Sequence, residues 1–231
     1  MATILFVISA SDHWTLIDGS THPTGYWAEE VATPYRVLTE AGHTVVAATP
    51  GGVVPTPDPT SLTPESTGGA DNAAQIRATL AEFATLNAPL RLEDVSARDY
   101  AAVFYPGGHG PMEDLAVDPT SGELLTTTVD SGIPLGVLCH APAALLAARR
   151  ADGSWPFAGY RMTGFTNTEE SQAGLADQAP WLLQDRLTEL GADFVSASPW
   201  SSHVVADRGL YTGQNPASSA ELARTILGAI Q

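Results

Sequence analysis

Lysine is absent from this sequence, and all ten of its basic residues are arginine. No lysine Schiff base can therefore form, and no phosphate-binding loop of the GK[ST] type exists. Basic residues are also few beside the 26 acidic ones, which gives a formal net charge of −16. A chain with this charge repels polyanions, so we expect neither nucleic acid nor an anionic membrane surface among its partners.

Cysteine is nearly absent as well, because Cys139 is the only one in 231 residues. No intrachain disulfide and no cysteine-based zinc site can be built from a single thiol. The apolar run MATILFVISA has no basic residues before it and is too short to span a membrane. We therefore expect a soluble, globular protein of a reducing cytoplasm.

Short apolar runs alternate along the chain with segments of helical spacing. In the latter, apolar residues recur at intervals of three and four, as at Val31, Tyr35 and Leu38. The alternation predicts an α/β fold, in which a doubly wound, mostly parallel sheet is sandwiched by helices. The runs, which we interpret as strands buried on both faces, cover residues 3–9, 44–49, 102–105 and 134–139.

The connections between these segments carry their own patterns. Gly42 and Gly191 each follow a helical segment and precede a strand, so we expect both in the left-handed conformation that ends helices. Ser218 and Glu221 have the spacing of a capping box. The stretch 51–70 is rich in Pro, Thr and Gly, and we interpret it as an ordered loop inside one domain that covers residues 1–231.

Cys139 stands where an apolar run gives way to an Ala-rich helical segment, and His140 follows it directly. In open parallel sheets, ligands bind at the carboxyl ends of strands. The placement is typical of a nucleophile elbow, a sharp turn that exposes a side chain above the sheet. A helix N-terminus at this point predicts a lowered pKa for the thiol. The alternative interpretation is a small core residue, which most lone cysteines are.

Other strand ends carry glycines and acids. Gly107 and Gly108 can bring backbone N–H donors close to a ligand, although an ordinary turn explains them as well. Glu30 lies beside the buried stripe of its helix, but the acid pairs at 29–30 and 169–170 also fit a role at a helix dipole. The histidines show no metal-binding spacing and no dinucleotide pattern follows a strand, so we expect no metal and no cofactor.

Several segments together resemble the ThiJ/PfpI superfamily, whose flavodoxin-like fold is that of class I glutamine amidotransferases. The chain is similar above all to the branch that holds glyoxalase III enzymes and the heat-shock-protein-thirty-one chaperones. The matching segments, in the family's order, are TGYWAEEVATPY (24–35), ATPGGVVPTPDPTSL (48–62), YPGGHGPMEDL (105–115), GVLCHAPAAL (136–145), MTGFTNTEE (162–170) and LYTGQNPASS (210–219).

The resemblance implies a role for each matching residue. It identifies Cys139 as the nucleophile, His140 as its histidine and Glu30 as the acid beside the thiol. The acid that partners the histidine falls on Glu170, with its neighbour Glu169 as the alternative. The residues it implies for the oxyanion pocket and for substrate binding are Gly108, Gly107, His109, Tyr26 and Trp27.

These residues are suited to aldehyde chemistry. Attack of a thiolate on methylglyoxal gives a hemithioacetal, which passes through an enediol to a thioester and then to lactate. We therefore expect a glutathione-independent, cysteine-dependent lyase of the glyoxalase III (D-lactate dehydratase) type, with a small carbonyl substrate. The alternatives are a hydratase, amidase or deglycase with a larger substrate, and a redox-sensing holdase chaperone. The resemblance also implies a homodimer and a part in stress responses.

Overall fold

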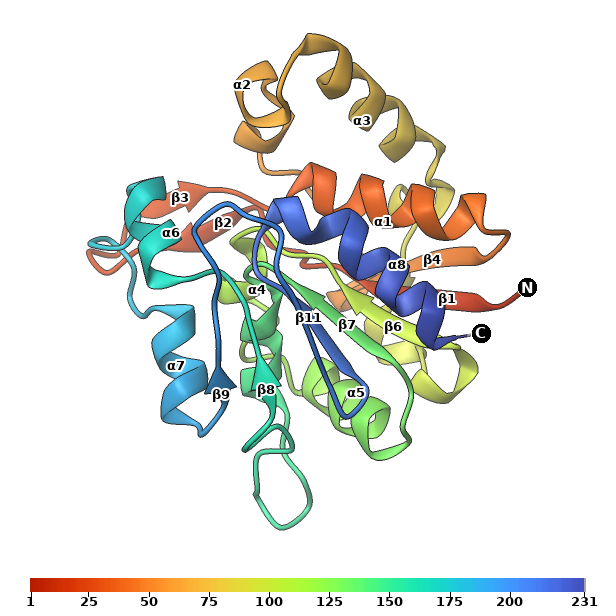
Figure 1. Ribbon diagram of the computed structural model, residues 1–231, viewed down its shortest axis with the longest axis vertical. Helices are drawn as coiled ribbons and strands as arrows, with labels where there is room; N and C mark the ends of the chain where they lie inside the picture. Colours follow the sequence, from red (N-terminus) through yellow and green to blue (C-terminus); the bar gives the residue numbers. More distant parts are fainter. Residues whose placement is uncertain (231) are drawn as a thin grey trace.

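A seven-stranded sheet forms the centre of the protein, as the computed structural model of residues 1–230 shows (Figure 1). The strand order is β10-β11-β7-β6-β1-β4-β5, and only β10 and β11 are antiparallel. Two small sheets, β2-β3 and β8-β9, lie beside it. The strands are β1 (Thr3–Val7), β2 (His13–Thr15), β3 (Thr21–Pro23), β4 (Thr44–Thr49), β5 (Leu90–Arg91), β6 (Ala102–Tyr105), β7 (Leu135–Leu138), β8 (Arg161–Met162), β9 (Asp193–Phe194), β10 (Val204–Asp207) and β11 (Leu210–Gly213).

Helices cover both faces of this sheet. On one face α1 and α8 pack against each other, while α4 and α5 lie on the other (Figure 1). The α-helices are α1 (Ala28–Glu40), α2 (Pro64–Thr67), α3 (Ala70–Glu82), α4 (Gly110–Glu113), α5 (Pro119–Asp130), α6 (Asn167–Ala173), α7 (Leu183–Glu189) and α8 (Ser219–Ala229). The 3₁₀ turns are η1 (Pro50–Gly52), η2 (Thr60–Leu62), η3 (Ala84–Leu86), η4 (Leu92–Asp94), η5 (Ala97–Asp99), η6 (Ala141–Ala147) and η7 (Pro216–Ser218).

The predicted fold class is confirmed by this architecture. The four apolar runs form β7, β6, β1 and β4, which are consecutive strands at the centre of the sheet. Helices bury both faces of these strands, so their sequences are almost continuously apolar instead of alternating. Strands β10 and β11 have no counterpart in the sequence prediction, because both are short and mix polar with apolar residues.

Two of the predicted connections are confirmed and one is wrong. Gly42 and Gly191 have φ of +86° and +92°, the left-handed conformation expected of them. Ser218 does not cap α8 with its side chain. Its hydroxyl donates to the carbonyl of His203, and Glu221 accepts instead from the hydroxyl of Ser202.

Residues 51–70, expected to be a loop, also contain the short helix α2 and the turn η2, and they lead directly into α3. Helices α2 and α3 form a layer outside α1 (Figure 1). Ile76 and Leu80 are buried on the inner side of α3, so this layer is packed onto the molecule. No helix within residues 1–230 is both long and apolar enough to cross a membrane.

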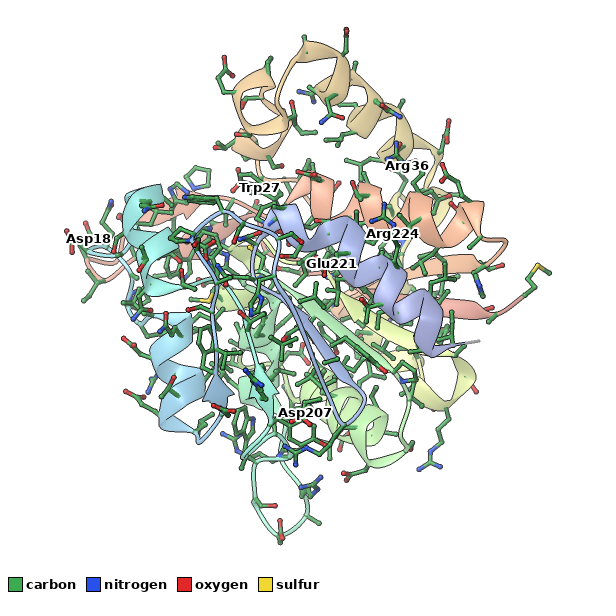
Figure 2. The ribbon with its side chains drawn as sticks, viewed as in Figure 1. Asp18, Trp27, Arg36, Asp207, Glu221 and Arg224 are labelled. Atoms are coloured by element: carbon green, nitrogen blue, oxygen red, sulfur yellow. The ribbon has the colours of Figure 1, made fainter. Side chains whose placement is uncertain are left out.

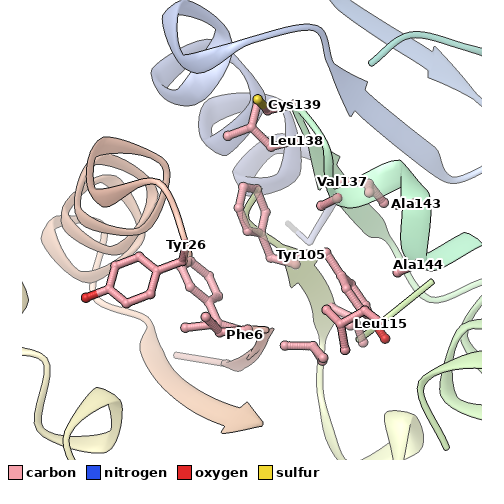
Figure 3. Packing of buried hydrophobic residues seen from close by; sticks show 14 of the residues in the cluster. Phe6, Tyr26, Tyr105, Leu115, Val137, Leu138, Cys139, Ala143 and Ala144 are labelled. Carbon is pink, nitrogen blue, oxygen red and sulfur yellow. The ribbon is translucent and has the colours of Figure 1, made fainter. Parts of the chain in front are cut away.

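The core is one continuous cluster of buried apolar side chains. In its centre the rings of Phe6 and Phe104 stack with centroids 4.9 Å apart. Figure 3 shows part of this core, with Cys139 at the tip of β7, beyond Val137 and Leu138. The apolar core therefore supports the end of the strand from which the candidate nucleophile projects.

Candidate active site

Cys139 directly follows β7 and has a backbone φ of +59°. This conformation costs a residue other than glycine about 1–3 kcal/mol, so the surrounding structure must impose it. Two hydrogen bonds hold it: the Cys139 N–H donates to the Gly213 carbonyl (2.9 Å), and the Cys139 carbonyl accepts from the Phe165 N–H (2.8 Å). The geometry is that of a nucleophile elbow.

His140 connects the thiol to a carboxylate. Its Nδ1 lies 3.3 Å from the Cys139 sulfur, and its Nε2 lies 2.7 Å from Oε2 of Glu170. An ionised carboxylate can only accept, so the ring proton belongs on Nε2 and Nδ1 is free to take the thiol proton. Burial and the nearby His109 lower the pKa of His140 to about 4, which keeps the ring neutral at pH 7.

Glu170 binds a second histidine with its other oxygen. Oε1 lies 2.8 Å from Nε2 of His109, and the His109 and His140 rings are 3.9 Å apart between centroids. Trp14 stacks on His109, and the Phe165 ring lies tilted against His140 with centroids 4.2 Å apart. Burial opposes ionisation of Glu170, but the two histidines outweigh it and hold the pKa of this carboxyl below its usual range.

Glu30 approaches the thiol from α1. Its Oε2 accepts the N–H of Gly107 (2.8 Å), and the carboxyl also interacts with the Cys139 thiol. The buried Oε1 has no hydrogen-bond partner among the described residues. Burial raises the pKa of Glu30 to about 8, although both of these contacts lower it in part. At neutral pH this carboxyl is therefore protonated and can donate to the sulfur.

The pKa of the Cys139 thiol is raised, whereas the sequence predicted a lowered one. Burial raises the pKa of Cys139, the Glu30 carboxylate raises it further, and the Gly108 N–H offsets them only in part. The expected α-helix after the elbow is the 3₁₀ turn η6, so a helix dipole contributes little. His140 must consequently accept the proton when the sulfur attacks.

Gly107 and Gly108 permit the close approach of these groups. A Cβ on Gly107 would lie 2.8 Å from Oε2 of Glu30 and 2.9 Å from the Cβ of Cys139. A Cβ on Gly108, whose φ is +95°, would lie 2.6 Å from the backbone nitrogen of Trp27. Both positions therefore require glycine. The Gly108 N–H lowers the pKa of the Cys139 thiol in part, as a donor to a developing anion would.

Glu169 is distinct from Glu170 in position and partners. It closes the capping box of α6 with Thr166, and its Oε1 accepts from the Trp200 N–H and from the side chains of Gln214 and Asn215. Burial opposes ionisation, but these donors hold the pKa of Glu169 below its usual value. The carboxylate on the histidine is thus that of Glu170, and Glu169 has a separate place in the structure.

A small pocket of about 70 Å³ opens above the sulfur. Pockets for drug-sized ligands are typically some 300–1,000 Å³, so this one admits only a few heavy atoms. Trp27, which precedes α1 (Figure 2), is one of its walls, whereas the buried Tyr26 faces a different hollow. The pocket is lined by Trp27, Gly108, His109, Cys139, His140, Phe165, Ala173, Trp200 and Pro216.

Phe165 and Trp200 are the site residues that the sequence reasoning missed. Phe165 belongs to a matching segment, but only the fold shows that its backbone holds the elbow. Trp200 comes from a loop without any pattern. A larger hollow of about 300 Å³, lined by Trp181, Arg149 and neighbouring residues, contains none of the groups around Cys139.

His109, His140 and Glu170 are also the one set of described residues whose geometry could hold a metal ion, with ligand atoms within 4.8 Å of one another. Around a tetrahedral zinc ion with bonds of about 2.0 Å, ligand atoms lie about 3.3 Å apart. The N···O distances of 2.7 and 2.8 Å are those of direct hydrogen bonds instead. The arrangement as it stands therefore fits two imidazoles donating to one carboxylate.

A mostly parallel sheet with a cysteine elbow, an adjacent histidine and carboxylates on both sides defines the class I glutamine amidotransferase-like proteins. Residues 23–229 match the DJ-1/PfpI family, to which this chain belongs. Among solved structures, Rapid Encystment Protein 24 kDa of Francisella tularensis is 28% identical, with a TM-score of 0.88 and 100% of each chain covered. Glyoxalase III of Candida albicans shares the fold at 24% identity, with a TM-score of 0.85, over 99% of this chain and 97% of that one.

Two curated relatives extend this comparison. The protein/nucleic acid deglycase HchA of Staphylococcus aureus is 27% identical over 237 residues, which cover 98% of this chain and 81% of the relative. The human glutamine amidotransferase-like class 1 domain-containing protein 1 is 32% identical over 139 residues, or 60% of this chain. That match spans 63% of the human protein's length.

Proposed function

We propose that this protein is a glutathione-independent glyoxalase that converts a small 2-oxoaldehyde, such as methylglyoxal, to the 2-hydroxy acid. The observation that carries the proposal is the Cys139 sulfur 3.3 Å from the unprotonated Nδ1 of His140, whose Nε2 is held by Glu170. The sulfur faces a pocket of about 70 Å³, which suits a three-carbon aldehyde. The family resemblance to named glyoxalase III and deglycase enzymes supports an enzyme of this kind.

The first step is addition of the thiol to the aldehyde. Nδ1 of His140 takes the proton of Cys139 as the sulfur attacks the aldehyde carbon, which becomes a hemithioacetal. The Gly108 N–H and the protonated Glu30 carboxyl are the donors available to the developing oxyanion and the sulfur. Because both donors are fixed by backbone or burial, little reorganisation accompanies the attack.

The second step moves a hydrogen between two carbons. A base removes the proton from the hemithioacetal carbon to give an enediol, and protonation at carbon two then leaves a thioester on Cys139. His140 is a candidate base once it has passed the thiol proton to the oxyanion, which becomes the hemithioacetal hydroxyl; Glu30 is the other candidate, after giving up its own proton. His109 presents a further imidazole to the same pocket. Water then hydrolyses the thioester, so that the sum of the steps adds one water to the 2-oxoaldehyde.

The experiment that tests the proposal is turnover of methylglyoxal in heavy water without glutathione. An enediol route passes the migrating hydrogen through a base that exchanges with solvent, so the lactate should carry deuterium at carbon two. Lactate without deuterium would indicate a hydride shift instead. Absence of lactate, from protein whose Cys139 still reacts with iodoacetamide, would contradict the glyoxalase proposal.

A deglycase is the second candidate, and the likeness to the HchA protein of Staphylococcus aureus favours it. The same thiol would attack the aldehyde-derived carbon of an adduct on an amine or thiol. Supplying a preformed adduct while a scavenger removes free methylglyoxal separates the two activities. A glyoxalase stops under these conditions, whereas a deglycase continues.

The other expectations from the sequence remain proposals. A hydratase or amidase would need more room than the pocket above Cys139 offers, and a redox-sensing holdase would not require His140. Replacement of His140 therefore separates an enzyme from a sensor. Sedimentation of the purified protein tests the homodimer, and fractionation of cells tests the cytoplasmic location.

A further inference from the structure

Trp200 stands over the pocket in an unusual backbone conformation. Its φ is +62°, a left-handed value that favours glycine, and its ring is about half exposed. The ring also lines the Cys139 pocket and meets Phe165 edge-on, with centroids 5.5 Å apart. A large aromatic residue kept in a strained conformation needs a structural reason.

Glu169 supplies that reason. This carboxylate is fully buried, and its Oε1 accepts the N–H of Trp200 at 2.8 Å. The same oxygen accepts from Asn215 and Gln214, and Oε2 is bound by the backbone and hydroxyl of Thr166. A buried charge with this many fixed donors is a rigid anchor, and the indole N–H of Trp200 is tied to Gln172 as well.

The pocket is correspondingly narrow. Trp200, Phe165 and Trp27 are three aromatic walls around a space of about 70 Å³, and all three come from different parts of the chain. Of these walls, Trp27 precedes α1 and Phe165 packs on His140, so neither can move without disturbing the site. Trp200 is the wall that is exposed to solvent on its other side.

We propose that Trp200, positioned by Glu169, sets the upper size limit of the aldehydes that reach Cys139. Resting on the proposed function, this assigns the substrate class as two- and three-carbon 2-oxoaldehydes and excludes aryl-substituted ones such as phenylglyoxal. Trp200 is thus a specificity-determining residue, and Glu169 is a positioning residue that does not touch the substrate. The chemistry at the sulfur is unchanged by either assignment.

The test uses the rate at which Cys139 is alkylated by a small and by a bulky reagent. Because Cys139 is the single cysteine, iodoacetamide and N-phenylmaleimide can modify no other thiol. Trp200→Gly removes the ring and suits the left-handed backbone. It should raise the phenylmaleimide rate about tenfold or more, and far more than it changes the iodoacetamide rate. Trp200→Phe should give an intermediate ratio of the phenylmaleimide rate to the iodoacetamide rate. It keeps the proposal testable if the glycine variant does not fold.

Two further variants complete the design. Glu169→Gln replaces one of the acceptor oxygens, Oε1 or Oε2, by an NH₂ group that donates, and so weakens the anchor that holds Trp200. It should therefore shift the ratio of the two alkylation rates in the same direction as Trp200→Gly. A purely structural role for Glu169 would lower the melting temperature and leave that ratio unchanged. Trp181→Ala, at the separate hollow, is the matched control and should leave both rates unchanged.

The outcomes for specificity and for function are distinct. With active enzyme, Trp200→Gly should raise the kcat/KM for phenylglyoxal relative to that for methylglyoxal by about tenfold. Equal alkylation ratios in wild type, Trp200→Gly and Trp200→Phe would overturn the assignment of Trp200. Lack of turnover of either aldehyde by the wild type would overturn the proposed function, while the alkylation ratio would still judge Trp200.

Discussion

The rings of His109 and His140 lie against each other with centroids 3.9 Å apart and an interplanar angle of 39°, and each directs its Nε2 at a different oxygen of one carboxylate. The shared acceptor, Glu170, therefore fixes both rings in the tautomer with the proton on Nε2. Trp14 and Phe165 close the stack from outside and leave the rings little freedom.

Glu170→Gln should disable the site, because an amide offers one acceptor oxygen where two N–H groups donate. One histidine must then change tautomer or lose its partner. We expect kcat/KM to fall by about 10²-fold or more and stability at pH 7 to fall by about 1–3 kcal/mol. Turnover and urea denaturation measure the two effects.

The stability effect should depend on pH. The pKa of Glu170 is lowered in the folded protein, so its stabilisation is present above the unfolded value of 4.5 and is lost as the pH falls below it. The gap in stability between wild type and Glu170→Gln should therefore be constant above about pH 5 and narrow between about pH 5 and pH 3. A gap that does not narrow would show that the carboxylate is not held ionised by the histidines.

Both Cys139→Ala and Cys139→Gly should abolish turnover. Of the two folded variants, Cys139→Gly should be the more stable. Alanine usually stabilises an element relative to glycine, but at a φ of +59° the order reverses. We expect a difference of about 1 kcal/mol in favour of glycine. Denaturation midpoints of the two variants measure it, and alanine as the more stable would show that the elbow is not strained.

Glu30→Gln should stabilise the protein more at pH 8 than at pH 5. The pKa of Glu30 is raised to about 8 in the folded state, so its contribution is fully present below the unfolded value of 4.5 and is lost as the pH rises towards 8. At about 1.4 kcal/mol per pH unit between the unfolded and folded pKa values, the gain in stability grows by up to about 4 kcal/mol between pH 5 and pH 8. Glutamine avoids this loss because it never ionises.

The control for this measurement is Glu40→Gln at the exposed end of the same helix, which removes only a surface pair with Arg36. That variant should show no comparable dependence on pH. Turnover adds a second readout: Glu30→Gln keeps the donor to the sulfur but cannot pass a proton. If Glu30 transfers protons, its activity should fall by about 10²-fold.

Gly107→Ala should damage both stability and thiol reactivity. The added methyl would lie 2.5 Å from the Leu138 carbonyl and 2.8 Å from Oε2 of Glu30, so strand and carboxyl must separate. We expect a loss of about 1–3 kcal/mol, the usual cost of overpacking. Gly228→Ala in α8, where a Cβ meets nothing within 4 Å, is the control and should stabilise by about 0.5–1 kcal/mol.

The sequence was sufficient for the centre of the fold and for the nucleophile. The strands buried on both faces leave continuous apolar runs, and the change from such a run to Cys139 and His140 marks the elbow. The family motifs further indicated Glu30 and Glu170, which the structure brings to the thiol and to the histidine. Local pattern and motif together were therefore enough to identify a site residue where the end of a strand supplies the side chain.

The remaining features depend on tertiary structure. The raised pKa of Cys139 follows from burial, which no local pattern reveals. The wall formed by Trp200 depends on a hydrogen bond from a loop to Glu169, 31 residues earlier. Tyr26 adjoins Trp27 in sequence but faces another hollow, because neighbouring side chains in an extended segment point in opposite directions.

The backbone clamp on Cys139 also has a consequence for the order of assembly. The Cys139 N–H donates to the carbonyl of Gly213, so this half of the elbow exists only when β11 is paired with β7. A chain in which β7 has formed without β11 lacks the bond, and nothing then offsets the cost of the left-handed conformation at Cys139. We therefore expect the thiol to take its orientation above the sheet only when β11 docks.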